Sequence, residues 1–127
     1  MEIWATGASY QGWQQVLSSL LASGYEISLT ENGVPVSISL DMDMFSEELD
    51  VAYCLEVLVG GQVWTTQFFS TSVIDFQGSP ELIRTDEDLD AIMEFMRDIA
   101  RFSHRSVIFI PETLDAEGVG RYLVIDP

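Results

Sequence analysis

VAYCLEVLVGGQVWTTQFF, residues 51–69, decides the fold of this chain. Two runs rich in β-branched and aromatic residues flank Gly60-Gly61, and such runs around a glycine pair are typical of a β-hairpin. In the first run both sets of alternate residues are largely apolar, with Glu56 as the one acid. We therefore expect a central strand that is covered on both faces.

Further stretches extend this sheet. Residues 25–40 alternate in the same way around Asn32-Gly33, which is a type I′ turn signal, and they form the clearest hairpin of the chain. Pro35 places its second strand at a sheet edge or at a strand start. The other candidate strands are short apolar runs at the N-terminus and at 72–76, 106–110 and 121–125.

Two stretches have helical spacing instead. About residues 9–23, apolar side chains recur every three or four positions after Ser9, which is a good N-cap. About residues 86–103, the helix follows Thr85 as N-cap, with Asp88 in the capping-box position. Helices set apart from grouped strands indicate an α+β fold, a mostly antiparallel sheet of about five to seven strands with two helices packed on it.

The length and composition fit one domain over residues 1–127. The chain is 47% apolar, which is enough material for a core. Its one cysteine excludes an internal disulfide and fits a reducing compartment. The N-terminus has no basic leader, and no stretch approaches the ~20 apolar residues of a membrane span. We expect a cytoplasmic protein that does not bind membranes.

The charge of the chain is its strongest global feature. Twenty-one acids face five bases, all arginine, for a net charge of −16. Residues 1–83 hold eleven acids and no base, a net −11, and residues 84–127 hold ten acids and five arginines, a net −5. Such a surface repels nucleic acid and attracts cationic proteins. We expect a basic protein partner and no direct nucleic-acid binding, although charge that merely keeps a structural subunit soluble remains an alternative.

The densest acidic stretch is LDMDMFSEELD, residues 40–50, with five carboxylates in eleven residues. Its D-x-D start suggests a calcium loop, but the EF-hand positions that require a third oxygen ligand, a glycine and a glutamate hold Phe45, Ser46 and Ala52. That pattern is excluded. A looser divalent-metal site remains an alternative and would use Asp41, Asp43, Glu47 or Glu48.

Apolar residues interleave with these acids, which fits either docking onto the core or a surface that contacts a partner. If they point outward, the stretch is a binding edge; if inward, it is an ordinary acidic connection. An aromatic side chain on the following strand would provide an interface anchor within an acidic rim. The predicted partner-binding residues are Asp41, Asp43, Met44, Phe45, Glu47, Glu48, Asp50 and Trp64.

No catalytic signature is present. His104 is the only histidine, and the chain has no C-x-x-C pair, no G-x-S-x-G elbow and no phosphate-binding loop. We therefore expect no enzyme activity and no cofactor. A hydrolytic domain that uses Glu56 or His104 stays an alternative, but Glu56 more simply meets solvent or an arginine, and His104 more simply ends the second helix.

In size, acidity and lack of a catalytic motif, the chain resembles bacterial immunity proteins that block secreted nuclease toxins. It is also similar to phage-type nucleic-acid mimics. This resemblance is compositional and transfers no individual residue. It implies a small acidic protein that binds a basic groove and neutralises it, with carboxylates steering the encounter and apolar anchors giving specificity.

Overall fold

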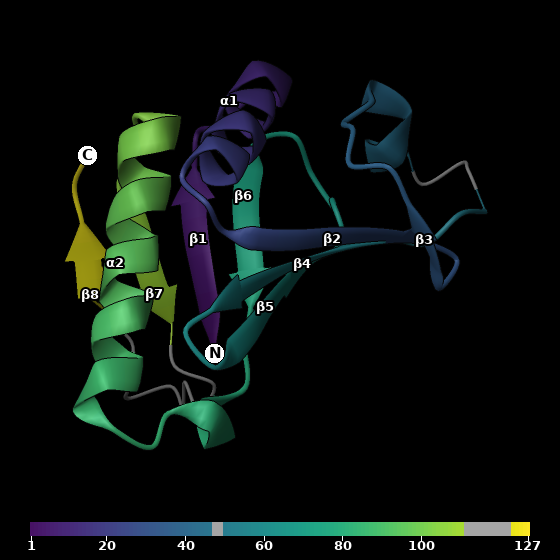
Figure 1. The fold of residues 1–127 in the computed structure, drawn as a ribbon. Helices are drawn as coiled ribbons and strands as arrows, with labels where there is room; N and C mark the ends of the chain where they lie inside the picture. The colour runs from purple at the N-terminus through teal and green to yellow at the C-terminus, as the bar shows by residue number, and fades with distance from the viewer. Residues whose placement is uncertain (47–49, 111–122) are drawn as a thin grey trace, which may run out of the picture.

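The computed structural model of the chain describes residues 1–46, 50–110 and 123–127, and at residue 82 the backbone alone. Within these residues one antiparallel sheet of eight strands carries two long helices on one face (Figure 1). No helix of this part of the chain has both the length and the apolar character needed to cross a membrane. The predicted α+β fold is confirmed, with eight strands rather than five to seven.

The strands begin at the N-terminus and end two residues before the C-terminus. In chain order they are β1 (Glu2–Thr6), β2 (Glu26–Glu31), β3 (Val34–Val36), β4 (Tyr53–Val59), β5 (Gln62–Thr66), β6 (Val73–Gln77), β7 (Val107–Ile110) and β8 (Leu123–Ile125). Across the sheet the order is β3-β2-β4-β5-β6-β1-β7-β8. The three-residue strands β3 and β8 form its two edges, and each of the eight strands coincides with one of the candidate stretches.

Both predicted hairpins are present, and their turns use the expected residues. Asn32 and Gly33 have φ values of 50° and 81° between β2 and β3, as a type I′ turn requires. Gly60 has φ 61° between β4 and β5. Left-handed backbone is strained for most side chains, so these residue types fix where each hairpin turns.

The sheet bends sharply between β5 and β6. These two strands share one Cα pair, Thr65 with Gln77, whereas β4 and β5 share five. Figure 1 shows β2, β4 and β5 running across the direction of β1 and β6. We call residues 26–66, which comprise β2 to β5 and their connections, the hairpin half of the molecule.

The two long helices are α1 (Tyr10–Ala22) and α2 (Asp86–Ser103), within one residue of the predicted ends. The Ser9 side chain caps α1, and Thr85 with Asp88 forms the expected capping box of α2. Backbone N–H groups of residues 84 and 85 donate to the Asp88 carboxylate and lower its pKa. His104 ends α2 through its backbone, at φ 56° and with its N–H donating to Ala100 O.

The expectation that residues 51–59 are covered on both faces is wrong. In β4 the residues Leu55, Val57 and Val59 are buried, but Glu56 is exposed and Leu58 is 38% exposed. Both long helices lie on the same face of the sheet, so the opposite face of this central strand meets solvent (Figure 1). Glu56 thus reaches solvent, as the simpler interpretation of its charge had predicted.

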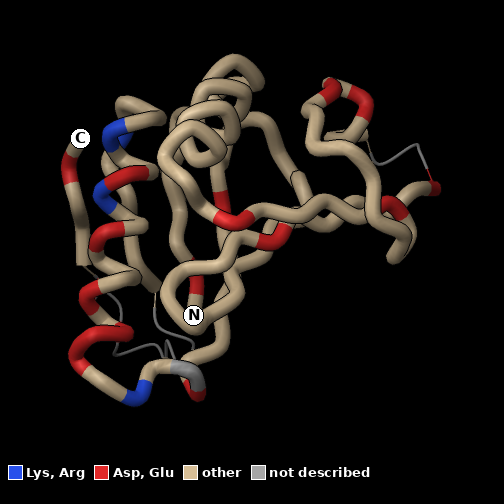
Figure 2. Tube along the Cα trace, viewed as in Figure 1, with Lys and Arg blue, Asp and Glu red and all other residues tan. Residues whose placement is uncertain are grey.

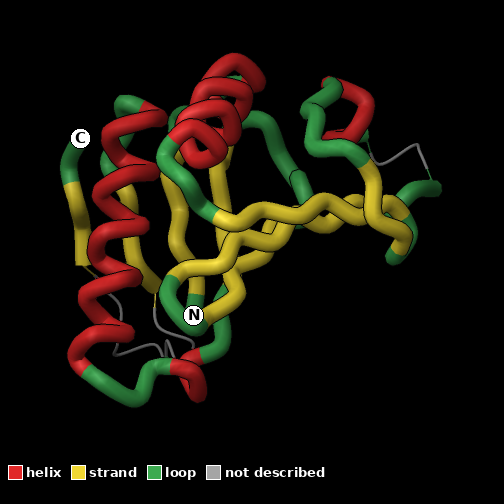
Figure 3. The backbone as a smooth tube through the Cα atoms, viewed as in Figure 1, coloured by secondary structure: helices red, strands yellow, loops and turns green. Residues whose placement is uncertain are grey.

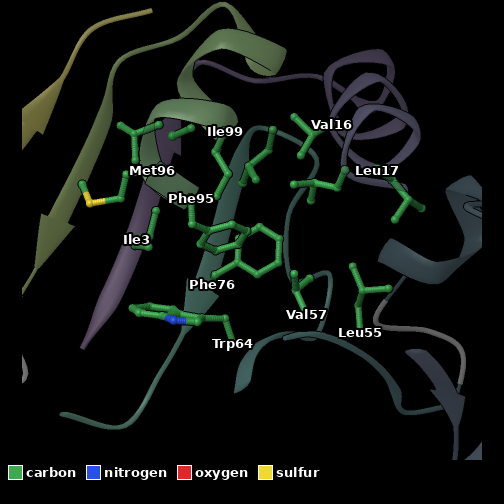
Figure 4. Close-up of a cluster of buried hydrophobic side chains, with 14 of the residues drawn as sticks. Ile3, Val16, Leu17, Leu55, Val57, Trp64, Phe76, Phe95, Met96 and Ile99 are labelled. Atoms are coloured by element: carbon green, nitrogen blue, oxygen red, sulfur yellow. The ribbon is translucent and has the colours of Figure 1, made fainter. Parts of the chain in front are cut away.

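The core fills the space between the sheet and the two helices (Figure 4). Phe95 of α2 packs edge-on against Phe76 of β6, with ring centroids 5.3 Å apart, and it packs tilted against Trp64 of β5 at 6.1 Å. All three side chains are fully buried. Aromatic packing of this kind joins the two halves of the bent sheet through α2.

Asp75 of β6 is a half-buried carboxylate on the uncovered face of the sheet. It lies opposite Trp4 of β1 in the sheet register, and no ion pair to it occurs among the described residues. Burial, with a smaller contribution from Glu2, raises the pKa of the Asp75 carboxyl. A folded-state pKa above the unfolded one favours the fold at acid pH, and this contribution is lost as the pH rises through the folded value.

We therefore expect Asp75→Asn to stabilise the protein at neutral pH, by at most about 1 kcal/mol because the carboxylate is still partly solvated. The gain should shrink as the pH falls toward the ordinary aspartate value of 3.8. Denaturant unfolding at several pH values measures this difference. Glu56→Gln, on an exposed site of the same face, removes one charge without relieving burial; an equal gain there would attribute the effect to net charge alone.

Candidate partner-binding site

The acidic stretch predicted as a binding edge folds into a short 3-10 helix, η1 (Met42–Phe45). The Asp41 carboxylate caps it by accepting a hydrogen bond of 3.0 Å from the backbone N–H of Asp43. Both aspartate side chains remain exposed to solvent. Figure 3 shows this short helix standing apart from α1 and α2, with loops on either side. Asp41 therefore shapes the stretch and also contributes charge to its surface.

The apolar residues of η1 divide between the two sides. Met44 is 9% exposed and joins the core, whereas Met42 is 54% exposed. The Phe45 ring lies 5.5 Å from that of Trp13 in α1 and 5.4 Å from that of Phe68. Met44 is therefore not the exposed anchor that the sequence suggested, because burial in the core holds most of its side chain inward. Phe45 is half-buried, and its contacts fix η1 to α1.

Trp64 is likewise not available as an exposed partner anchor. It is 0% exposed on the inner face of β5, where it packs against Phe95. The exposed aromatic of this region is Phe69, which is 61% exposed. β5 ends at Thr66, but the alternation of burial continues beyond it, with Phe68 buried and Phe69 exposed. Phe68 has a left-handed φ of 57°, which is uncommon for a bulky residue.

A hollow of about 240 Å³ lies between η1, the start of β4 and the segment after β5. Seven of its nine lining residues are apolar or aromatic. We call it the Phe69 hollow, and its lining residues are Met44, Phe45, Ser46, Val51, Ala52, Tyr53, Gln67, Phe68 and Phe69. Phe45 and Phe68, whose rings meet at 78°, tie this surface to the core.

Carboxylates lie close to one of the lining residues, Tyr53. Tyr53 donates a hydrogen bond of 3.3 Å to Glu31 Oε1 across the β2–β4 pair. Desolvation, followed by the negative charges of Glu31, Asp41 and Asp43, raises the pKa of the Tyr53 hydroxyl. Asp50 is exposed on the same connection to β4. The hollow thus combines aromatic walls with a negative potential.

No base offsets this charge within the hairpin half. Residues 26–66 contain eight acids and neither lysine nor arginine. In Figure 2 the arginines of the described residues lie along α2 and just beyond its ends, while acids are found in both halves. Folding therefore keeps the asymmetry seen in the sequence and turns it into an acidic half and a half of mixed charge.

A second hollow, of about 530 Å³, lies between the start of β2, the β4–β5 turn and α2. Three of its lining residues are acids, Glu26, Glu94 and Asp98. Arg101 forms an ion pair of 2.9 Å with Asp98, and Tyr25 donates to the same carboxylate at 2.6 Å. Burial and this bond raise the pKa of Tyr25. Because these internal contacts already satisfy Asp98, the Phe69 hollow is the better candidate.

The remaining predicted residues have different outcomes. Glu47 and Glu48 lie outside the described residues. No group of three or more metal-ligating side chains gathers in the part of the chain that the structure describes. His104 and Glu56 are both exposed, at the end of α2 and on the outer face of β4. Asp41 and Asp43 are thus exposed in η1 next to Phe45, and Asp50 is exposed before β4, whereas Met44 and Trp64 are buried.

Two functional candidates were missed from the sequence, Phe69 and Tyr53. A signal for Phe69 existed, because two consecutive phenylalanines cannot both point inward from a regular strand. Tyr53 had no local signal, since its role depends on β2 placing Glu31 beside it. Comparison of the chain with protein-family models, with curated proteins and with solved structures finds no match in any of the three.

Proposed function

We propose that the chain is a small cytoplasmic protein that binds and neutralises a basic protein partner, most simply as an immunity-type inhibitor of a bacterial nuclease toxin. One observation carries the proposal. The hairpin half holds eight acids and no base, and six of its residues form one side of a hollow lined mainly by apolar and aromatic residues. A charged surface with an apolar centre is typical of an interface with fast association and slow dissociation.

The toxin class follows from the same electrostatics. A nuclease must attract phosphates, so its substrate groove is positively charged. A protein of net charge −16 is attracted to such a groove and covers it by mimicking the charge of nucleic acid. For the same reason this chain would not bind nucleic acid itself. A partner with a basic groove but another activity would be bound by the same surface.

The test begins with a defined partner, the basic secreted-type polypeptide encoded next to the gene for this chain. We expect the purified pair to form a complex whose association rate constant falls as salt is added. We also expect the chain to block the polypeptide's nuclease activity. If no basic polypeptide is encoded there, and none binds at low salt, the proposal is wrong.

Charge variants locate the surface. Asp41→Asn, Asp43→Asn and Asp50→Asn together should lower the association rate constant roughly three- to tenfold at low salt, because three steering charges are lost. Asparagine still caps η1 at position 41, so the fold should be kept. The matched control, Glu87→Gln with Asp90→Asn and Glu94→Gln, removes three exposed charges from α2. Equal effects of both triple variants, measured by stopped-flow, would mean that net charge acts without a defined site.

A further inference from the structure

We propose that the Phe69 hollow receives an arginine side chain of the basic partner, with the guanidinium against the aromatic rings and toward the carboxylates of Glu31, Asp41 and Asp43. The inference rests on the proposed function and specifies the central contact of that surface. Three features of the hollow carry it: its aromatic walls, its acidic border and its rigidity.

The aromatic walls favour a cation with an apolar stem. Phe69 is 61% exposed and offers a ring to an incoming group, while Phe45, Phe68 and Tyr53 supply the remaining rings of the lining. A guanidinium stacks on such rings, and the methylene groups of arginine pack against apolar atoms such as those of Val51. Lysine shares the charge but lacks the flat group that stacks.

The acidic border makes a neutral or anionic occupant less suitable. Tyr53 is in the lining, and its hydroxyl donates to Glu31 Oε1 at 3.3 Å, so a carboxylate is bound to one of the residues that form the hollow. Asp41 and Asp43 add their charge to the same hydroxyl. A leucine side chain would fill the apolar space but leave these charges uncompensated, and a glutamate would be repelled.

The rigidity of the walls lowers the entropic cost of binding. Phe45 and Phe68 each contact Trp13, at 5.5 and 5.3 Å, and the Trp13 indole N–H donates a hydrogen bond of 3.0 Å to Ser70 O. These contacts connect η1, α1 and the segment after β5. A surface that is already ordered loses little conformational freedom when a side chain enters it.

The first experiment titrates the chain with Nα-acetyl-arginine amide and records backbone amide NMR spectra. We expect saturable shifts that concentrate on the residues lining the hollow, and no comparable shifts with Nα-acetyl-citrulline amide, which has the same shape without the charge. Nα-acetyl-leucine amide tests an apolar occupant. Equal shifts with the citrulline or leucine compound, or arginine shifts spread evenly over all exposed acids, would overturn the inference.

Variants of Phe69 test the aromatic contact. Phe69→Ala should weaken binding of the arginine compound about two- to fivefold, which is the value of one partly exposed cation–π contact. Phe69→Leu keeps an apolar side chain without the ring and should weaken binding of the arginine compound similarly. Phe69→Trp keeps an aromatic ring and should retain that binding. Since Phe69 is exposed, unfolding midpoints should stay close to that of the unchanged protein. Unaltered binding by Phe69→Leu would contradict the cation–π contact.

The same variants separate this inference from the proposed function. If the chain binds its basic partner but neither Phe69→Ala nor the arginine compound has an effect, the hollow is not the arginine site and the function stands. If the arginine compound binds in the hollow but no basic partner is found, the proposed function is wrong, whereas the arginine site is supported. Loss of partner affinity in Phe69→Ala, with an unchanged salt dependence, supports both.

Discussion

Trp13→Ala is expected to lower the free energy of unfolding by about 3–5 kcal/mol, the usual cost of truncating a buried large aromatic side chain. Trp13 is 2% exposed and its ring lies within 5.3 to 6.4 Å of those of Phe45, Phe68 and Phe76. Its removal leaves a cavity where α1, η1 and β6 meet. Because domains of this size are stable by only about 5–15 kcal/mol, this one change is a large part of the total.

Trp13→Phe is the matched control for this prediction. It retains a buried ring but loses the indole donor to Ser70 O, so we expect a smaller loss of about 1–2 kcal/mol. Urea unfolding followed by circular dichroism measures both variants without depending on tryptophan fluorescence. A loss below about 1 kcal/mol for Trp13→Ala would contradict the packing described here. A folded Trp13→Ala protein should also bind the arginine compound less tightly, since the walls of the Phe69 hollow lose their support.

Gly78→Ala should destabilise the protein by about 1–3 kcal/mol through overpacking. A Cβ atom at this position would lie 2.8 Å from Cε2 and 2.9 Å from Cδ2 of the Trp64 indole. The indole is fully buried against Phe95 and has no free space to move into. The backbone of Gly78 is also fixed, because its N–H donates to Met1 O and its carbonyl accepts from the N-terminal amine.

Gly61→Ala provides the comparison for the same chemical change. A Cβ atom there meets nothing within 4 Å, and the residue does not have a left-handed φ. We expect a change within about 0.5 kcal/mol. Thermal and urea unfolding of the two variants measure the difference. Similar losses of stability in Gly78→Ala and Gly61→Ala would mean that the flexibility of glycine, and not contact with Trp64, causes the effect.

Local sequence determined most of the secondary structure. Asn32-Gly33 and Gly60 turn the two hairpins because their backbone reaches positive φ values at low cost. Ser9, Thr85 and Asp88 start the helices because their side chains accept hydrogen bonds from the first free N–H groups. Each of these signals acts between residues that are close in the chain, so it can be recognised without knowledge of the tertiary structure.

The sequence did not show in the same way which face of the sheet the helices cover. The run 51–59 is apolar in both alternate sets, which suggests burial on both sides, yet α1 and α2 occupy the same face. Trp64 points inward and Phe69 outward because the helices cover the face of β5 that carries residues 62, 64 and 66, and no local rule says which face that is. Periodicity specifies which residues share a face but not what packs against that face.

By itself, the sequence determined the two hairpins, the two helices and a hairpin half without a single base. Only the tertiary structure decided that Met44 points inward, that Phe69 is exposed, and that Glu31 meets Tyr53 next to an aromatic hollow. The reason is physical. Turns, caps and net charge depend on neighbouring residues or on totals, whereas a surface site depends on which distant segments the core brings together.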